Sequence, residues 1–134
     1  MKTPAFVTAI MLACVTGAGH LSAQTALRDE PKITEGLIIA GMAYELSERC
    51  DDIDVRLFRG LSYLQSLKSE ARALGYSSDE IEVYVDNRKE QDRLEAIARD
   101  RLADLGARSG DEASFCNVGR AQIAAETSVG RLLR

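Results

Sequence analysis

Two cysteines, Cys50 and Cys116, are the residues of this sequence best suited to redox chemistry. If the chain is exported, an even pair in an oxidising compartment predicts a disulfide. The bridge would close a loop of about 66 residues and stabilise the fold by ~4 kcal/mol on the chain-entropy model. The alternative is a pair of free or redox-active thiols, because Cys116 is expected in the first turn of a helix, which favours the reactive thiolate. Reactive pairs usually lie close together in sequence, so this wide spacing favours a structural bridge.

Other reactive groups are sparse. The single histidine, His20, lies in the N-terminal segment. Removal of that segment would leave no histidine for a Ser-His-Asp or Cys-His arrangement or for the usual zinc sites. Asp51, Asp52 and Asp54 are close together but lack the ligand pattern and glycine of a calcium loop, so helix capping is the favoured interpretation. We therefore predict no catalytic residue, no metal site and no cofactor. A thiol oxidoreductase is the only enzyme class with a candidate site.

Residues 1–23 have the pattern of a secretory signal peptide. A basic start is followed by an apolar run over residues 5–15 and by small residues up to Ala23. The run is too short for a stable membrane anchor, which needs ~20 residues. Cleavage after Ala23 would place the mature chain in the periplasm or outside the cell. A lipoprotein-type box at residues 11–14 is the alternative, in which Cys14 would carry lipid, but Cys14 comes early for that.

The charge balance limits the class of partner. The chain has 134 residues, with 17 Lys and Arg against 21 Asp and Glu, and a net charge of −4. A mature chain of roughly 110 residues corresponds to one domain. A mildly acidic chain of this size does not have the basic surface that nucleic acid requires. We expect an unknown protein or envelope partner, no nucleic acid, and no stable membrane span after cleavage.

The apolar periodicity predicts an all-α domain over residues 31–134, preceded by a short flexible stretch at 24–30. The helix expected at residues 32–49 is apolar nearly all round and should lie in the middle of the bundle. The helix expected at residues 53–74 would be capped by an aspartate and would organise the fold through one buried stripe. Gly60 on this stripe would mark its closest crossing with the first helix. The stripe consists of Ile53, Leu57, Gly60, Leu64, Leu67, Ala71 and Leu74.

A third helix is expected at residues 78–105. Gly75 ends the helix before it, and Gly106 ends the third helix itself. Ser77 and Glu80 form the pattern of a capping box at its start, with Tyr76 and Ile81 placed for the accompanying hydrophobic staple.

The polar segment at residues 86–93 separates two apolar faces of this third helix. Either the helix bends there, or its two halves are buried against different neighbours. A functional interpretation makes this segment a partner-binding ridge, and a solvated face with intrahelical ion pairs is the simpler one. The ridge residues would be Asp86, Arg88, Lys89, Asp92 and Arg93.

The last main helix should be capped by Asp111 or Ser114 and should continue through Ile123, with a short turn at residues 129–133. The predicted fold class is therefore all-α. We expect a small four-helix bundle, orthogonal or irregular, with room for a short C-terminal helix and with one disulfide.

Several segments resemble a family of small exported bacterial proteins that is known only as a domain of unknown function. The resemblance covers most of the chain after residue 23, and both Cys50 and Cys116 match the pair of that family. It implies an exported single domain with a Cys50–Cys116 bridge, and it implies no activity and no catalytic residue. The segments are Leu61-Ser62-Tyr63, residues 70–77, residues 113–116 and Gly119-Arg120.

These observations leave three functional hypotheses. The first is a non-catalytic protein-interaction or envelope accessory module in the periplasm. The alternative is an acid- or stress-type periplasmic chaperone, similar to the small disulfide-bridged helical acid chaperones. Protonation of the many carboxylates would leave Arg and Lys unopposed and loosen such a bundle. The third is a thiol-redox protein using Cys50 and Cys116.

Overall fold

The computed structural model describes residues 25–134, so the predicted signal peptide, with Cys14 and His20, lies outside the described residues. The described part contains five α-helices and two short 3-10 helices but no strand, which confirms the predicted all-α class. None of these helices combines the length and the apolarity needed to cross a bilayer. The elements are η1 (Leu27–Asp29), α1 (Pro31–Arg49), α2 (Leu57–Ala73), α3 (Ser78–Val85), α4 (Arg88–Asp104), α5 (Glu112–Ala124) and η2 (Gly130–Leu132).

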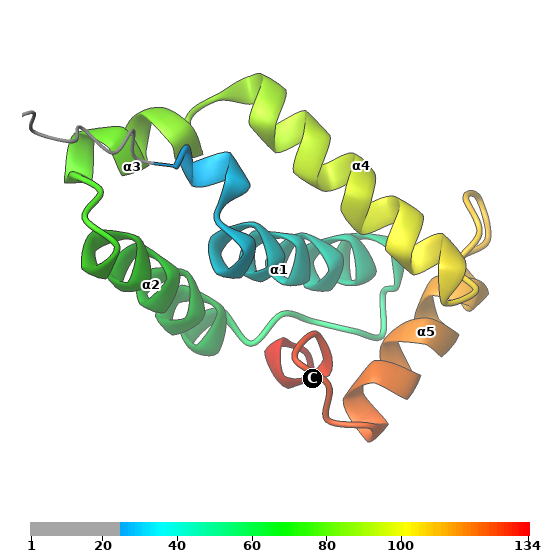
Figure 1. Ribbon diagram of the computed structural model, residues 1–134. Helices are drawn as coiled ribbons and strands as arrows, with labels where there is room; N and C mark the ends of the chain where they lie inside the picture. Colours follow the sequence, from blue (N-terminus) through cyan, green and yellow to red (C-terminus); the bar gives the residue numbers. More distant parts are fainter. Residues whose placement is uncertain (1–24) are drawn as a thin grey trace, which may run out of the picture.

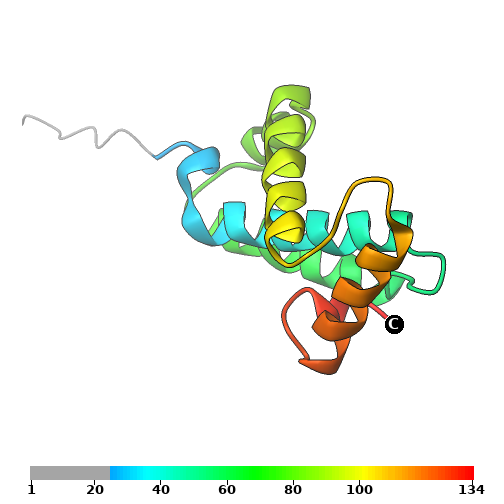
Figure 2. The same ribbon diagram turned by 90° about the vertical axis from the view of Figure 1, so that its right-hand side faces the viewer.

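Helix α1 lies in the middle of the bundle, as its apolar sequence predicts. It packs against α2, α4, α5 and both 3-10 helices, and it lies between α2 and α4 in Figure 1. Figure 2 shows α4 standing across α1 rather than alongside it. Ile38, Met42, Ala43 and Leu46 of α1 are all buried in the main hydrophobic cluster. Neighbours cover the apolar side chains of α1, while Tyr44 and Glu48 of the same helix stay exposed.

The second helix begins later than the predicted residue 53. It begins at Leu57, with Arg56 at the N-cap and no side-chain cap, so the expected aspartate cap is wrong. The cause is the C-terminal segment, which takes the backbone hydrogen bonds of the preceding residues. The N–H of Asp54 donates to Arg134 O at 3.0 Å, and the N–H of Arg56 donates to Leu132 O at 2.7 Å. The chain before α2 is therefore extended and cannot join the helix.

The predicted buried stripe is correct only in part, because Ile53 and Ala71 are buried and Leu67 packs on α1. Ala71 is the only residue of α2 that is fully buried, whereas Leu57, Leu64 and Leu74 are exposed. A side chain at Gly60 would meet nothing, so Gly60 does not mark the helix crossing. The close approach is at Gly36 of α1 instead, where a Cβ atom would overlap the side chain of Leu67.

The expected third helix is two helices. It breaks at Asp86 and Asn87, and the Asn87 side chain caps α4 by accepting from the backbone N–H of Glu90 at 3.3 Å. The capping box of Ser77 and Glu80 at the start of α3 is confirmed, with both hydrogen bonds present. Helix α3 packs on α2 and η1, while α4 packs on α1. The two apolar faces noted in the sequence therefore belong to separate helices with different neighbours.

The stretch before α1, expected to be flexible, is packed in the structure. Leu27 of η1 is buried in a second hydrophobic cluster with Ile33, Ala71, Tyr76 and Ile81. The hydroxyl of Tyr76 donates to the carbonyl oxygen of Thr25 and to Glu30 Oε1. This side chain joins the entry of α3 to the first described residues, and the pairing of Tyr76 with Ile81 agrees with the predicted staple.

Two ion pairs join α1 to α4. Arg101 donates two hydrogen bonds to Glu35, at 2.7 and 2.8 Å. The buried Glu45 accepts from Arg99 at 3.0 Å and also pairs with Arg49 at 3.5 Å. The hydrogen bonds from Arg101 lower the pKa of Glu35, and the partial burial of Glu35 opposes that shift. Both connections between these helices therefore require ionised carboxylates.

We expect Glu35→Gln to lower the free energy of unfolding at pH 7 by less than about 1 kcal/mol, because both partners are half-exposed. A carboxyl with a lowered folded-state pKa stabilises the fold above its ordinary range, and this contribution is lost as the pH falls through the folded-state value. The difference between the variant and the wild type should thus vanish near pH ~2, below the ordinary Glu pKa of ~4.3. Urea unfolding at both pH values measures this difference in the free energy of unfolding, with Glu48→Gln as the matched control on α1. The prediction would be contradicted if both variants lost the same stability, or if the loss in Glu35→Gln persisted in acid.

Candidate functional site

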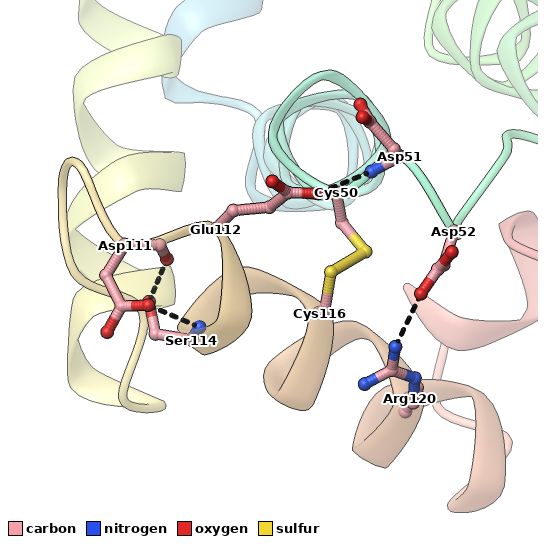
Figure 3. Close-up of a disulfide and its surroundings, with 8 residues drawn as sticks. All are labelled: Cys50, Asp51, Asp52, Asp111, Glu112, Ser114, Cys116 and Arg120. Carbon is pink, nitrogen blue, oxygen red and sulfur yellow. Dashed lines mark hydrogen bonds and ion pairs between the residues drawn. A yellow bond between two sulfur atoms is a disulfide. The ribbon is translucent and has the colours of Figure 1, made fainter.

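The two cysteines form a disulfide, which confirms the predicted Cys50–Cys116 bridge. The S–S distance is 2.05 Å, and the Cα atoms are 5.1 Å apart. Cys50 is the C-cap residue of α1. Helix α5 begins at Glu112, and the predicted cap at Asp111 is confirmed. Cys116 therefore lies in the second turn of α5, not in the first turn as predicted. The bridge joins the end of the central helix to the middle of α5 (Figure 3).

The surroundings of the bridge enclose both sulfur atoms. Cys50 is 0% exposed and Cys116 is 5% exposed. The Arg49 guanidinium lies 5.6 Å from the centre of the Phe115 ring, next to the bridge. Glu112 and Arg120 of α5 hold the loop after α1: Glu112 accepts from the backbone N–H of Asp51 at 3.3 Å, and Arg120 pairs with Asp52 at 2.9 Å (Figure 3). These contacts fit a bridge that fixes two helices.

The acidic group after Cys50 does not converge on one point. Asp52 pairs with Arg120, while Asp54 pairs with Arg134 at 3.8 Å. Within residues 25–134, no three His, Cys, Asp or Glu side chains come together in a way that would hold a metal ion. The arrangement of the three aspartates is therefore explained by contacts with α5 and the C-terminal segment.

The five residues of the predicted ridge do not share one role. Asp86 is the C-cap residue of α3, and its N–H donates to Glu82 O. Arg93 is half-buried and pairs with Glu90 at 2.9 Å. Arg88, Lys89 and Asp92 are exposed on the first turns of α4. The ridge stays a prediction, with only these last three residues free to meet a partner without breaking a contact described here.

Four large apolar side chains of α2 face solvent instead. The exposed fractions are 65% for Leu57, 85% for Phe58, 52% for Leu61 and 38% for Leu64. The three leucines follow one another at steps of four and three residues, so they lie in a line along the helix with Phe58 beside it. We call these four residues the α2 strip. An exposed apolar patch of this kind is typical of an interaction site.

Positive charge continues the line beyond the strip. Lys68 and Arg72 follow Leu64 at steps of four, so they lie on the same side of α2. Within the described part of the chain, neither cation forms an ion pair. Glu70 is the one acidic residue of α2, and it accepts from Lys32 of α1 at 3.1 Å.

A small apolar recess adjoins the strip between α1, α2 and α3. Its volume is about 100 Å³. Leu64 borders it from α2 and Val85 borders it from α3, and both side chains are also partly exposed. The recess therefore opens beside the strip. Its lining residues are Leu27, Ile33, Leu37, Leu64, Leu67, Lys68, Ala71, Ile81, Tyr84 and Val85.

The apolar pattern of α2 predicts a single apolar face, and the strip extends beyond that face. Phe58, Leu61 and Tyr63 fall off the predicted stripe, so this helix has more apolar residues than one buried face can hold. That surplus was the available signal. Tyr63 and Leu67 pack toward the core and so determine which apolar face of α2 is buried. The spacing of apolar residues does not show which face that is.

The disulfide should contribute strongly to stability. We expect the double variant Cys50→Ala/Cys116→Ala to lose ~4 kcal/mol in the free energy of unfolding, because the bridge closes a loop with a sequence separation of 66 residues. Urea denaturation of the oxidised protein, the reduced protein and the variant measures the loss. Reductant should have no effect on the variant. A change below ~1 kcal/mol would show that the bridge constrains the unfolded chain much less than its loop length implies.

Comparison with known proteins gives a family but no activity. The chain matches the model of a family described as a family of unknown function (DUF5333) over residues 25–134. No curated protein and no solved structure matches the chain. The match spans every described residue, including both cysteines, the α2 strip and Lys68, and it confirms the resemblance noted in the sequence. The chain therefore belongs to the family of unknown function DUF5333.

Proposed function

We propose that the protein is exported through residues 1–23 and acts in the periplasm as a non-catalytic protein-interaction or envelope accessory module. The observation that carries this proposal is the α2 strip. Soluble proteins expose single apolar side chains often, but contiguous groups of large ones mark interaction sites. At an interface, full burial of one such side chain contributes up to ~1.5–3 kcal/mol to the free energy of binding. The strip offers four of them, Leu57, Phe58, Leu61 and Leu64.

The strip differs from the other exposed apolar residues because it is contiguous. The others are dispersed: one is in α1, two are in α3, and two are the C-cap residues of α2 and α4, namely Tyr44, Val83, Val85, Leu74 and Leu105. The contact of α2 with α1 lies next to the strip, at Leu67, whose side chain occupies the space beside Gly36. A helix that packs through one face and leaves a second apolar face uncovered is suited to hold a partner.

The structure favours a structural role for the cysteine pair over the thiol-redox hypothesis. Exchange requires a thiolate to reach one of the two sulfur atoms. Cys50 and Cys116 are both buried, and the contacts of Arg49 and Glu112 lie around them. An exchanging pair would need an accessible sulfur.

The acid chaperone is the second candidate, and the ion pairs between α1 and α4 favour it. Glu35 forms its ion pair with Arg101 while ionised, and the hydrogen bonds from Arg101 lower the pKa of this carboxyl. Acid would therefore weaken the contact between these helices and could expose the apolar side of α1. Two measurements between pH 7 and pH ~3, where carboxylates protonate, test the chaperone hypothesis. Binding of a hydrophobic dye reports exposed apolar surface, and aggregation of an unfolding client protein reports protection. Absence of client protection in acid would eliminate it.

We expect a photo-crosslinking residue at position 58 to give discrete adducts with another protein in the periplasm. The same residue at position 44, which replaces the exposed Tyr44 of α1, should give none. Leu61→Ser should abolish the adducts from position 58 and change the free energy of unfolding by less than ~0.5 kcal/mol, because Leu61 is half-exposed. Val83→Ser is the matched control for loss of an exposed apolar residue outside the strip.

Equal adducts from positions 58 and 44, or adducts insensitive to Leu61→Ser, would contradict the interaction role of the strip. Intact mass of the periplasmic protein tests the export proposal separately. A mature chain beginning at Gln24 is expected, and recovery of the uncleaved chain from the cytosol would contradict export.

A further inference from the structure

We propose that the α2 strip binds an acidic amphipathic helix of a partner protein. One apolar side chain of that helix would enter the recess between α2 and α3, and its carboxylates would face Lys68 and Arg72. This inference rests on the proposed function and specifies the chemistry of the partner.

The line of residues suits a second helix laid along α2. Leu57, Leu61, Leu64, Lys68 and Arg72 follow at steps of four, three, four and four residues. At 1.5 Å per residue this line is about 22 Å long, which a partner helix of about four turns would cover. Its apolar part lies at the N-terminal end of α2 and its basic part at the C-terminal end. Helices that bind in grooves present their anchor residues at the same spacing.

The size of the recess indicates what enters it. Pockets for small molecules have volumes of roughly 300–1,000 Å³, whereas this recess measures about 100 Å³. A cavity of ~150 Å³ holds one benzene molecule. The recess therefore accommodates a single aliphatic side chain, not a ligand of its own. Lys68 is the one charged residue in its lining, so a carboxylate next to the inserted side chain would meet the ammonium group of Lys68.

The charge distribution explains why the partner should be acidic. The chain as a whole carries a net charge of −4, but α2 and its N-cap residue carry four cations and one acid. Arg56 and Arg59 donate to the backbone carbonyls of Leu133 and Arg131, not to carboxylates. Helix α4 also has two exposed cations, Arg88 and Lys89, but its acids balance its cations, whereas α2 has an excess of positive charge.

Two other occupants fit this surface less well. A second copy docked through the same strip would offer no free carboxylate of α2 to Lys68 and Arg72, because Glu70 is the one acid of that helix and it pairs with Lys32. An anionic bilayer would attract the cations but offers no fixed side chain for the recess. A partner helix with apolar anchors and flanking acids satisfies the strip, the recess and the charge together.

The test uses synthetic fluorescent helices of about 16 residues, long enough to cover the line. They have leucines at steps of three and four residues, flanked by Glu in one peptide and by Lys in the other. We expect the mature protein to bind the Glu peptide about tenfold more tightly than the Lys peptide. Lys68→Glu/Arg72→Glu should reverse this preference, and replacement of the central leucine by alanine should weaken binding about tenfold.

Arg88→Glu/Lys89→Glu is the matched control, because it makes the same charge change with exposed cations of α4. It should leave both affinities unchanged. Rescue of the Lys68→Glu/Arg72→Glu variant by the Lys peptide also shows that this variant is folded. Equal affinity for the two peptides, failure to bind either one, or an equal effect of the α4 control would overturn the inference.

The other occupants give distinct results. Binding to phosphatidylglycerol vesicles but not to the Glu peptide would assign the surface to a membrane and overturn the inference. A dimer in analytical ultracentrifugation that Leu61→Ser dissociates would assign it to a second copy and overturn it equally. Adducts from position 58 in the periplasm test the proposed function independently, so they can persist when the acidic-helix inference fails.

Discussion

The fold depends on burial of the apolar residues of the central helix α1, which packs against α2, α4, α5 and both 3-10 helices. Helix α1 has apolar residues around most of its circumference, and its neighbours come from both ends of the chain. The disulfide fixes the end of this helix to α5, and the pairs of Glu35 and Glu45 fix its side to α4. Helix α1 contributes more buried apolar side chains than any other helix, whereas Ala71 is the only fully buried residue of α2. Its second apolar face remains available for interaction.

Features set by local chemistry could be predicted from the sequence. The capping box at Ser77, the cap at Asp111 and the stop at Gly75 depend on residues within a few positions of each other, and all three are present. The start of α2 could not be predicted in this way. Residues 54–56 bond to residues 132–134, and the pattern before Leu57 holds no trace of that distant pairing.

The candidate site was harder to predict than the fold. The disulfide followed from the number and spacing of the cysteines, but the α2 strip required knowledge of which side of α2 meets α1. Gly36 determines this, because the missing side chain leaves room for Leu67. A glycine on one helix thus orients another helix, and hydrophobic periodicity identifies apolar faces without telling a core face from a binding face.

The position of the last residues affects when the fold can form. Leu133 is fully buried, and Gly130 has no room for a side chain because the backbone of Gln122 lies against it. The hydrogen bonds that hold the segment before α2 come from these final residues. A nascent chain therefore cannot complete its core until residue 133 has been synthesised. The final residues therefore act as the closing element of the core, and every shorter chain leaves the segment before α2 without its backbone partners.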